Sequence, residues 1–337
     1  ATAGITSVTL GTSNFVAGVN AGNSITSGGN YNTVVGDEAG TAITTGDANV
    51  AFGYQSLVAN ATTANNTAVG YQSLYSNVTN NNTGLGWKAG YAITTGAQNT
   101  AIGHASLLAT TTGATNTAVG FTALTSNTTG ASNTAVGNES LTANTTGASN
   151  TAVGASALLA NTTGVANTAV GKGSLDANTT GGSNAAIGVN SLGGNTTGLY
   201  NSAVGAFALN ANTTANSNSA VGYTAMFNTT TGANNTAVGH TAMYANTTGG
   251  TNTAVGYSSL AANTTGGTNT AVGYSSMQDN TTGANNVSLG YEALGDNTTA
   301  AGNAAAGYKA LRFNTTGASL SAFGAYALYN NTTGSNN

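Results

Sequence analysis

A glycine that closes an Ala-Val-Gly triplet, or a close variant of it, recurs along almost the whole chain. From Gly86 to Gly324 every step is 17 residues, the step from Gly70 is 16, and the first step, from Gly18, is 18. Nineteen such repeats span Asn14 to Asn336. A fixed short period of this kind is typical of repeat architectures, in which one structural unit stacks on the next. Any fold of this chain must therefore be built from one small unit used many times.

The consensus of one repeat, numbered from its leading Asn, is N-T-A-V-G-Y-x-[AS]-L-x-A-N-T-T-G-x-x. Position 4 is nearly always Val, Ile, Leu or Phe, and position 9 is Leu or Met in most repeats. Three repeats have Gly at position 9 and an isoleucine three places later, at Ile25, Ile43 and Ile93. The apolar side chain has moved within these repeats, which indicates that it fills an interior.

Seventeen residues are too few for a pair of helices, whose repeats run to roughly 33–47 residues. The repeat is also rich in Gly, Thr and Asn, which favour turns and strands over helix. We therefore predict an all-β fold, a β-solenoid (β-roll) of nineteen coils with two short strands per coil and about 4.8 Å between coils. Residues 14–337 would form one continuous solenoid, preceded by a strand or cap over residues 1–13.

Stacking gives each consensus position a predicted role. Positions 4 and 9 should point into the coil as two apolar ladders, while Asn at position 12 should form amide ladders at a corner. The residues concerned in four consecutive repeats are Val119, Val136, Val153 and Val170, then Leu124, Leu141, Leu158 and Leu175, and Asn127, Asn144, Asn161 and Asn178. The small residues at positions 3 and 5 should lie on the opposite face of the first strand, where another copy can approach closely. We therefore expect a homo-oligomer, a trimer packed around that strand, and a positive φ at the Gly of position 15.

Composition excludes several classes of partner. Only 4% of residues are charged and the formal net charge is −4, so the chain lacks the basic stripe that nucleic acid requires. No apolar run approaches the roughly 18–20 residues of a membrane-spanning helix. There is no cysteine, which excludes disulfides and thiolate metal sites. We expect no cofactor, no bound metal and no membrane insertion.

The departures from the repeat do not suggest an enzyme. His104 and His240 replace the usual Tyr at position 6, eight repeats apart, and neither has an obvious partner. Asp279 and Asp296 share position 11 in adjacent repeats and could approach one another, but nothing nearby completes an acid–base site. We interpret these residues as surface variants and expect a non-enzymatic protein.

Position 6 carries a stripe of aromatic residues that offers an alternative function. Such a stripe could bind glycans or a host receptor, or it could pack against the strand edge or another protomer, and we favour packing. Its members in the later repeats are Tyr223, Tyr257, Tyr274, Tyr291 and Tyr308. The Asn-Thr-Thr runs satisfy the N-glycosylation rule, but a structural turn ladder explains them as well. Their Thr rows raise ice binding as a further alternative, although adjacent residues of a strand point to opposite faces.

The first 13 residues lie outside the repeat register. Ile5, Val8 and Leu10 are apolar, and the latter two alternate as in a strand. We expect this segment to contact another subunit, so that copies of the chain stack head to tail into a filament.

The "NTAVG" motif, followed by a small residue and Leu, resembles the head repeats of trimeric autotransporter adhesins of the YadA type. Similar arrays of "NTAxGxxAL" and "NTTG" occur in phage tail-fibre proteins and large bacterial surface proteins. The resemblance covers nearly the whole chain and implies a left-handed trimeric β-roll, exposed outside the cell or on a virion. It also implies adhesion or fibre formation. We therefore expect an extracellular structural fibre or adhesin shaft that assembles with copies of itself.

Overall fold

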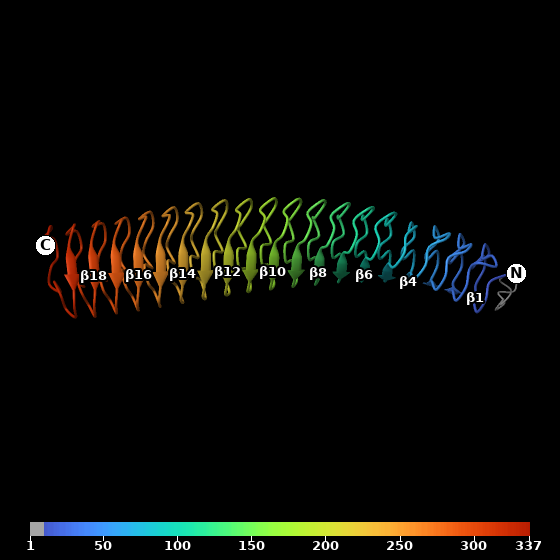
Figure 1. The fold of residues 1–337 in the computed structure, drawn as a ribbon, viewed down its shortest axis with the longest axis horizontal. Coiled ribbons are helices and arrows are strands. Elements are labelled where there is room, and N and C mark those ends of the chain that lie inside the picture. The colour runs from blue at the N-terminus through green and yellow to red at the C-terminus, as the bar shows by residue number, and fades with distance from the viewer. Residues whose placement is uncertain (1–9) are drawn as a thin grey trace. The chain divides into compact units, whose positions relative to one another are not determined.

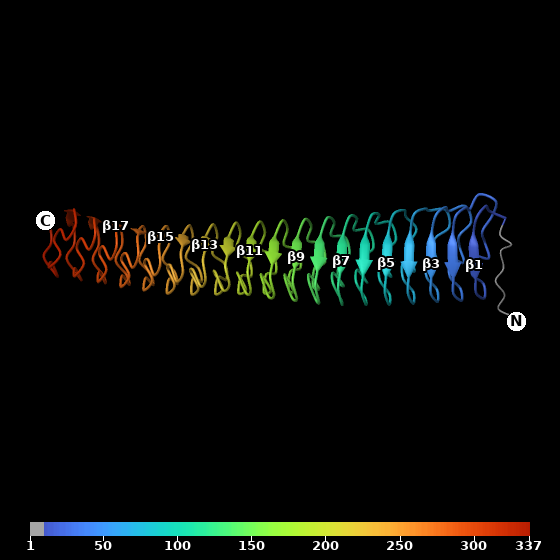
Figure 2. The same cartoon turned by 90° about the horizontal axis from the view of Figure 1, so that it is seen from below.

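The computed structural model describes residues 10–337, and the chain divides into two compact units, residues 1–167 and 168–337. Both units are parallel β-solenoids without helix in their described residues. Within each unit the strands lie side by side in chain order and loops complete each coil (Figures 1 and 2). Ile5 and Val8 fall outside the described residues, and Leu10 is 79% exposed.

Each coil contributes one strand of three residues, at positions 2 to 4. The strands of the N-terminal unit are β1 (Phe15–Ala17), β2 (Thr33–Val35), β3 (Val50–Phe52), β4 (Thr67–Val69), β5 (Thr83–Leu85), β6 (Thr100–Ile102), β7 (Thr117–Val119), β8 (Thr134–Val136) and β9 (Thr151–Val153). Those of the C-terminal unit are β10 (Thr168–Val170), β11 (Ala185–Ile187), β12 (Ser202–Val204), β13 (Ser219–Val221), β14 (Thr236–Val238), β15 (Thr253–Val255), β16 (Thr270–Val272), β17 (Val287–Leu289), β18 (Ala304–Ala306) and β19 (Ser321–Phe323).

Consecutive strands pair in register, so that equivalent positions lie directly over one another. In β7 and β8, for example, Thr117 is opposite Thr134 and Val119 is opposite Val136. The 16-residue repeat keeps this register, because Thr67 of β4 is opposite Thr83 of β5. The missing residue is absorbed in the turn after position 12, so strand pairing is independent of the length of that turn.

The prediction of two strands per coil is wrong. The second segment, which begins at position 6, forms turns because two of its residues have left-handed backbone conformations. In the coil that contains β7, these are Thr122 at position 7 (φ 51°) and Leu124 at position 9 (φ 53°). Two positive φ angles separated by one residue curl the chain and prevent an extended strand.

The predicted inward orientation of the position 4 valines is also wrong. In β7 the burial pattern is intermediate, buried, intermediate, and Ala118 at position 3 is fully buried. Successive side chains of a strand point to opposite faces, so the burial of position 3 places positions 2 and 4 outside. Val119, Val136 and Val153 accordingly lie on the outer face of the N-terminal unit, and Val170 lies on the outer face of the C-terminal unit; Val153 and Val170 are exposed. The alanines of position 3 fill the coil interior, so they do not form a surface on which the predicted trimer could pack.

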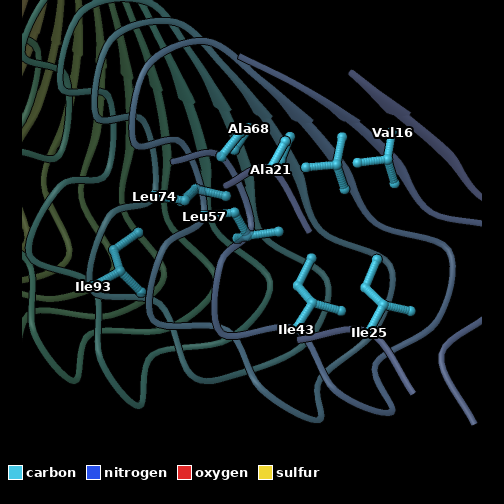
Figure 3. Close-up of a cluster of buried hydrophobic side chains, with 11 residues drawn as sticks. Val16, Ala21, Ile25, Ile43, Leu57, Ala68, Leu74 and Ile93 are labelled. Atoms are coloured by element: carbon cyan, nitrogen blue, oxygen red, sulfur yellow. The ribbon is translucent and has the colours of Figure 1, made fainter. Parts of the chain in front are cut away.

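The interior of each coil is narrow and is filled from both sides. Ala at position 3 meets the large side chain of position 9, and Leu124, Leu141, Leu158 and Leu175 are all fully buried. In the three variant repeats the isoleucine of position 12 takes over this role, and Ile43 and Ile93 are fully buried. Figure 3 shows Ile25 and Ile43 in neighbouring coils beside the row of Leu57 and Leu74.

Two rows of buried asparagine bond coil to coil. At position 1, the Asn133 backbone N–H and Nδ2 both donate to Oδ1 of Asn116, at 3.0 and 3.2 Å. At position 12, Asn144 Nδ2 donates to Asn127 Oδ1 at 2.9 Å, and Asn161 Nδ2 donates to Asn144 Oδ1 at 2.8 Å. The C-terminal unit has an equivalent row, in which Asn178 Oδ1 accepts from Asn195 Nδ2 at 2.8 Å. The amides fill a polar part of the core that would otherwise need apolar packing.

Glycine is required at position 5, where Gly120 has a φ of 144°, a conformation that other residues rarely adopt. At position 15 the predicted positive φ is absent. Position 15 also accepts other residues, since Thr63, Ala215 and Ala300 occupy it in three of the repeats.

Candidate binding surfaces

The outer face of the strand row is uncharged and carries an apolar stripe at position 4 beside a row of mostly Thr and Ser at position 2. Positions 2 and 4 face outward, and from β10 to β17 every position 4 side chain is exposed by 36–44%. These side chains are Val170, Ile187, Val204, Val221, Val238, Val255, Val272 and Leu289. No residue at position 2 or 4 of the nineteen repeats is charged. We call this the outer strand face, and it is an exposed apolar stripe of the kind that marks interaction sites.

The aromatic residues of position 6 form stacked ladders. In the C-terminal unit Tyr257, Tyr274, Tyr291 and Tyr308 stack with ring centroids 5.1–5.3 Å apart and interplanar angles of 7–19°. Tyr223 begins this ladder, and His240 lies between Tyr223 and Tyr257, 5.3 Å from each. All five tyrosines predicted as a surface stripe are exposed by 41–52%.

A shorter ladder runs along the N-terminal unit. His104 stacks between Trp87 and Phe121, with centroids 4.5 and 5.1 Å away. Neither histidine is therefore isolated: each occupies one step of an aromatic ladder in its own unit. Offset stacking of this kind contributes about 0.5–1.5 kcal/mol per pair beyond the area that it buries.

A second aromatic row, at position 10, was missed by the sequence reasoning. Phe227 and Tyr244 stack at 5.5 Å with an angle of 9°, and Tyr75 and Tyr91 stack at 5.1 Å. The signal was present as aromatic letters at the position after Leu, but position 10 varies too much between repeats to define a consensus.

Four charged side chains of the C-terminal unit form one cluster of ion pairs, made by Glu292, Asp296, Lys309 and Arg312. Arg312 Nε donates to Glu292 Oε2 at 3.0 Å, Lys309 Nζ lies 3.4 Å from the same oxygen, and Arg312 also pairs with Asp296. Burial raises the pKa of Glu292, but hydrogen bonds from Arg312 and Tyr291 outweigh it, and the pKa is lowered. The hydrogen bond to Glu292, with burial as a second cause, raises the pKa of Tyr291.

Asp296, which shares position 11 with Asp279 of the preceding repeat, belongs to this cluster through its pairing with Arg312. Within the described residues, no three His, Asp or Glu side chains lie close enough together to hold a metal ion. Residues 10–337 also contain no helix long and apolar enough to cross a membrane.

The Asn-Thr-Thr turns are occupied by internal bonds. Asn127, Asn144 and Asn161 are fully buried, so their amides are inaccessible to glycosylation in the folded coil. At position 13 the Thr128 hydroxyl donates to the Thr145 carbonyl oxygen at 3.0 Å. Only the Thr of position 14, such as Thr129, is exposed. The two Thr rows therefore do not form one flat array, which does not favour the ice-binding alternative.

Comparison with known proteins adds no family. No protein-family model matches the sequence, and no curated protein matches it. The chain is a β-solenoid repeat protein with about 17 residues per coil.

Proposed function

We propose that the chain is a structural, non-enzymatic segment of an extracellular fibre or adhesin shaft, and that copies of it assemble through the outer strand face. The observation that carries this proposal is the unbroken, uncharged apolar stripe of position 4 on the strand row. The resemblance of the repeat to YadA-type heads and tail-fibre arrays supports a location on a cell surface or a virion.

The stripe has a direct energetic consequence. Fully burying a Val or Leu side chain contributes about 1.5–3 kcal/mol, so covering the exposed 36–44% of each contributes about 0.5–1 kcal/mol per coil. One coil would be too weak to hold two copies together. Because every coil contributes this free energy of burial, many coils together can hold two copies of the chain. This explains why a fibre protein would repeat the outer strand face in every coil.

Lysine substitution on the stripe tests the proposal. We expect the wild-type chain to sediment as an oligomer, and Val255→Lys/Val272→Lys to shift toward the monomer, because two charges would be buried at the contact. The matched control is Thr265→Lys/Thr282→Lys, which places the same charges in the same two coils at exposed positions of another face. Circular dichroism should show both variants folded, since a lysine stem can lie along the surface with its ammonium in water.

Two results would contradict the proposal. One is a wild-type chain that stays monomeric at high concentration and forms no fibres by electron microscopy. The other is an oligomer that the stripe variant leaves intact, because the contact would then lie elsewhere.

A further inference from the structure

The aromatic row at position 10 is interrupted in the C-terminal unit. Phe227 and Tyr244 stack in successive coils, but the next coil has Ala261 at this position and the coil after that has Gln278. Among the described residues, Phe227 is the only ring that stacks on Tyr244, so no ring covers the opposite face of Tyr244, toward Ala261. The row therefore has a gap one coil wide between Tyr244 and Gln278.

This gap forms a hollow of about 360 Å³, within the range of roughly 300–1,000 Å³ that ligand sites occupy. Its lining joins the ring of Tyr244 to small side chains, including Ala261 and Ala262, and to the polar side chains of Gln278 and Asp279. Tyr244 is 39% exposed and Asp279 is exposed, so the hollow can be reached from solvent.

The width of the gap suits one planar group. Backbone hydrogen bonds of 2.9 Å, from Ala245 to Ala261 and from Ala262 to Gln278, hold the three coils together. Coils stack about 4.8 Å apart, so Tyr244 and Gln278, two coils apart, are separated by about 9.6 Å. Parallel rings in neighbouring coils of this chain have centroids 5.1–5.5 Å apart. One flat group above Ala261 would therefore lie at stacking distance from Tyr244.

Asp279 gives the hollow a negative charge. The ion pairs of the described residues are all made by other side chains, namely Glu292, Asp296, Lys309 and Arg312. No lysine, arginine or histidine lines the hollow. A planar cation is the ligand that gains most there, because it is attracted both by the carboxylate and by the face of an aromatic ring.

The chain itself fills a similar gap with a guanidinium group. Position 10 of a later coil is Gly295, and the side chain of Arg312, from the next coil, lies across it. A Cβ on Gly295 would be 2.9 Å from Arg312 Nη1 and 3.0 Å from its Cζ. The same guanidinium pairs with Asp296 at position 11 and lies 5.5 Å from the ring centroid of Phe313. The hollow has the same elements, with Asp279 as the acid at position 11 in the coil beside the gap.

We propose that the hollow binds the guanidinium group of an arginine side chain on a partner protein. The planar group stacks on the uncovered face of Tyr244 and donates hydrogen bonds to the carboxylate of Asp279, to which a guanidinium can present two parallel N–H groups. Lysine, a compact point charge, cannot stack in this way. One ring and one carboxylate contribute little at an exposed site, which favours an arginine whose flanking residues add further contacts.

The partner is a different protein and not a second copy of the chain. Arg312 is the only arginine of the sequence, and its guanidinium is already paired with Glu292 and Asp296. The hollow is formed by positions 7, 10 and 11, whereas the outer strand face is formed by positions 2 and 4. Binding of the arginine therefore does not depend on assembly through the outer strand face.

The test uses the full chain and a Gly-Arg-Gly peptide capped at both ends, with matched peptides that carry lysine or citrulline in place of arginine. Citrulline keeps the planar shape and loses the charge, whereas lysine keeps the charge and loses the plane. Ligand-observed NMR titration measures each dissociation constant. We expect the arginine peptide to bind and the other two to bind about fivefold more weakly, the effect of losing about 1 kcal/mol.

Substitutions locate the site. Tyr244→Ala and Asp279→Asn should each weaken binding of the arginine peptide about fivefold, by the same conversion. Ala261→Tyr keeps both contact residues and should abolish binding, because its ring would fill the gap and stack on Tyr244. Other coils already have tyrosine at position 10, so this variant should fold. Glu139→Gln, which removes an equal charge from the N-terminal unit, is the control and should leave binding unchanged.

Three results would overturn the proposal. The arginine peptide does not bind, the lysine or citrulline peptide binds as tightly as the arginine peptide, or Ala261→Tyr binds the arginine peptide like the wild type. Circular dichroism should show each variant folded, and Asp279→Asn, at an exposed position, keeps the comparison valid if Tyr244→Ala is destabilised. None of these results bears on assembly, which is read separately by sedimentation.

Discussion

Replacing Asn133 by alanine removes one step of the position 1 amide ladder in the N-terminal unit. The Asn133 side chain makes bonds to three coils: Nδ2 donates to Asn116 Oδ1 at 3.2 Å and to the Gly147 carbonyl oxygen at 2.9 Å. Its Oδ1 accepts from the backbone N–H and from Nδ2 of Asn150, at 2.9 and 3.2 Å. Asn133 is fully buried, so water does not replace these bonds at the surface.

The loss in the free energy of unfolding depends on which buried groups lose their hydrogen-bond partners. Asn116 Oδ1 keeps the backbone N–H of residue 133, and Asn150 Nδ2 keeps the Gly164 carbonyl oxygen at 2.8 Å. The Gly147 carbonyl oxygen keeps Nδ2 of Asn144, at 2.9 Å, so the Asn150 N–H is the group that is left unpaired and buried. An unpaired buried group costs about 1–3 kcal/mol, so we expect Asn133→Ala to destabilise its coils by about 1–3 kcal/mol.

Native-state hydrogen exchange is the appropriate assay, because a long repeat array need not unfold as one two-state body. Amides of the coils around residues 116–150 should exchange faster in the variant, with Asn150 affected most. Thr129→Ala, an exposed substitution in a neighbouring turn, is the control and should leave exchange unchanged. If Asn133→Ala exchanges like this control, the amide ladder does not stabilise the solenoid and the reasoning is refuted.

Three further outcomes are expected. At Gly256 the φ angle is 137° and a Cβ would overlap the carbonyl oxygen of the next coil. Gly256→Ala should therefore lower the melting temperature far more than Gly267→Ala, because Gly267 lacks the positive φ and a Cβ there would have more room. Met243→Leu, a volume-conserving change at a fully buried site, should cost under about 1.5 kcal/mol in urea unfolding, and Met243→Ala about 2–5. Because the folded pKa of Glu292 is lowered, its stabilisation is present above the unfolded pKa and is lost as pH falls through the folded pKa. Glu292→Gln should remove that acid dependence of hydrogen exchange at Arg312, and an unchanged pH profile would contradict the assignment.

Much of the fold could be predicted from the period alone. In-register stacking, the buried row that includes Leu124 and the amide row that includes Asn127 follow from identical residues lying over one another. The orientation of Val119 could not be predicted, because alternation says that neighbours face opposite ways but not which of them faces inward. That choice depends on how the chain turns, and it turns at Thr122 and Leu124, whose residue types carry no signal of a positive φ.

At the candidate binding surfaces, too, features that follow from the repeat could be predicted and features that arise from exceptions to it could not. The Tyr257 ladder was visible as a repeated letter, since stacking follows directly from register. The edge-on packing of Phe207 against Tyr223 was not, because it arises from an exception, an aromatic residue displaced by one position from the consensus. Consensus reasoning averages over such exceptions, although they are where a repeat protein can differ along its length.

The 16-residue repeat shows how this protein could change over generations. Its strands keep their pairing although one turn has lost a residue. A change in the length of that turn therefore needs no compensating change in the neighbouring strands. Because neighbouring coils share one strand register, whole coils can be added or removed in the same way, and the length of the solenoid can then vary in steps of one coil.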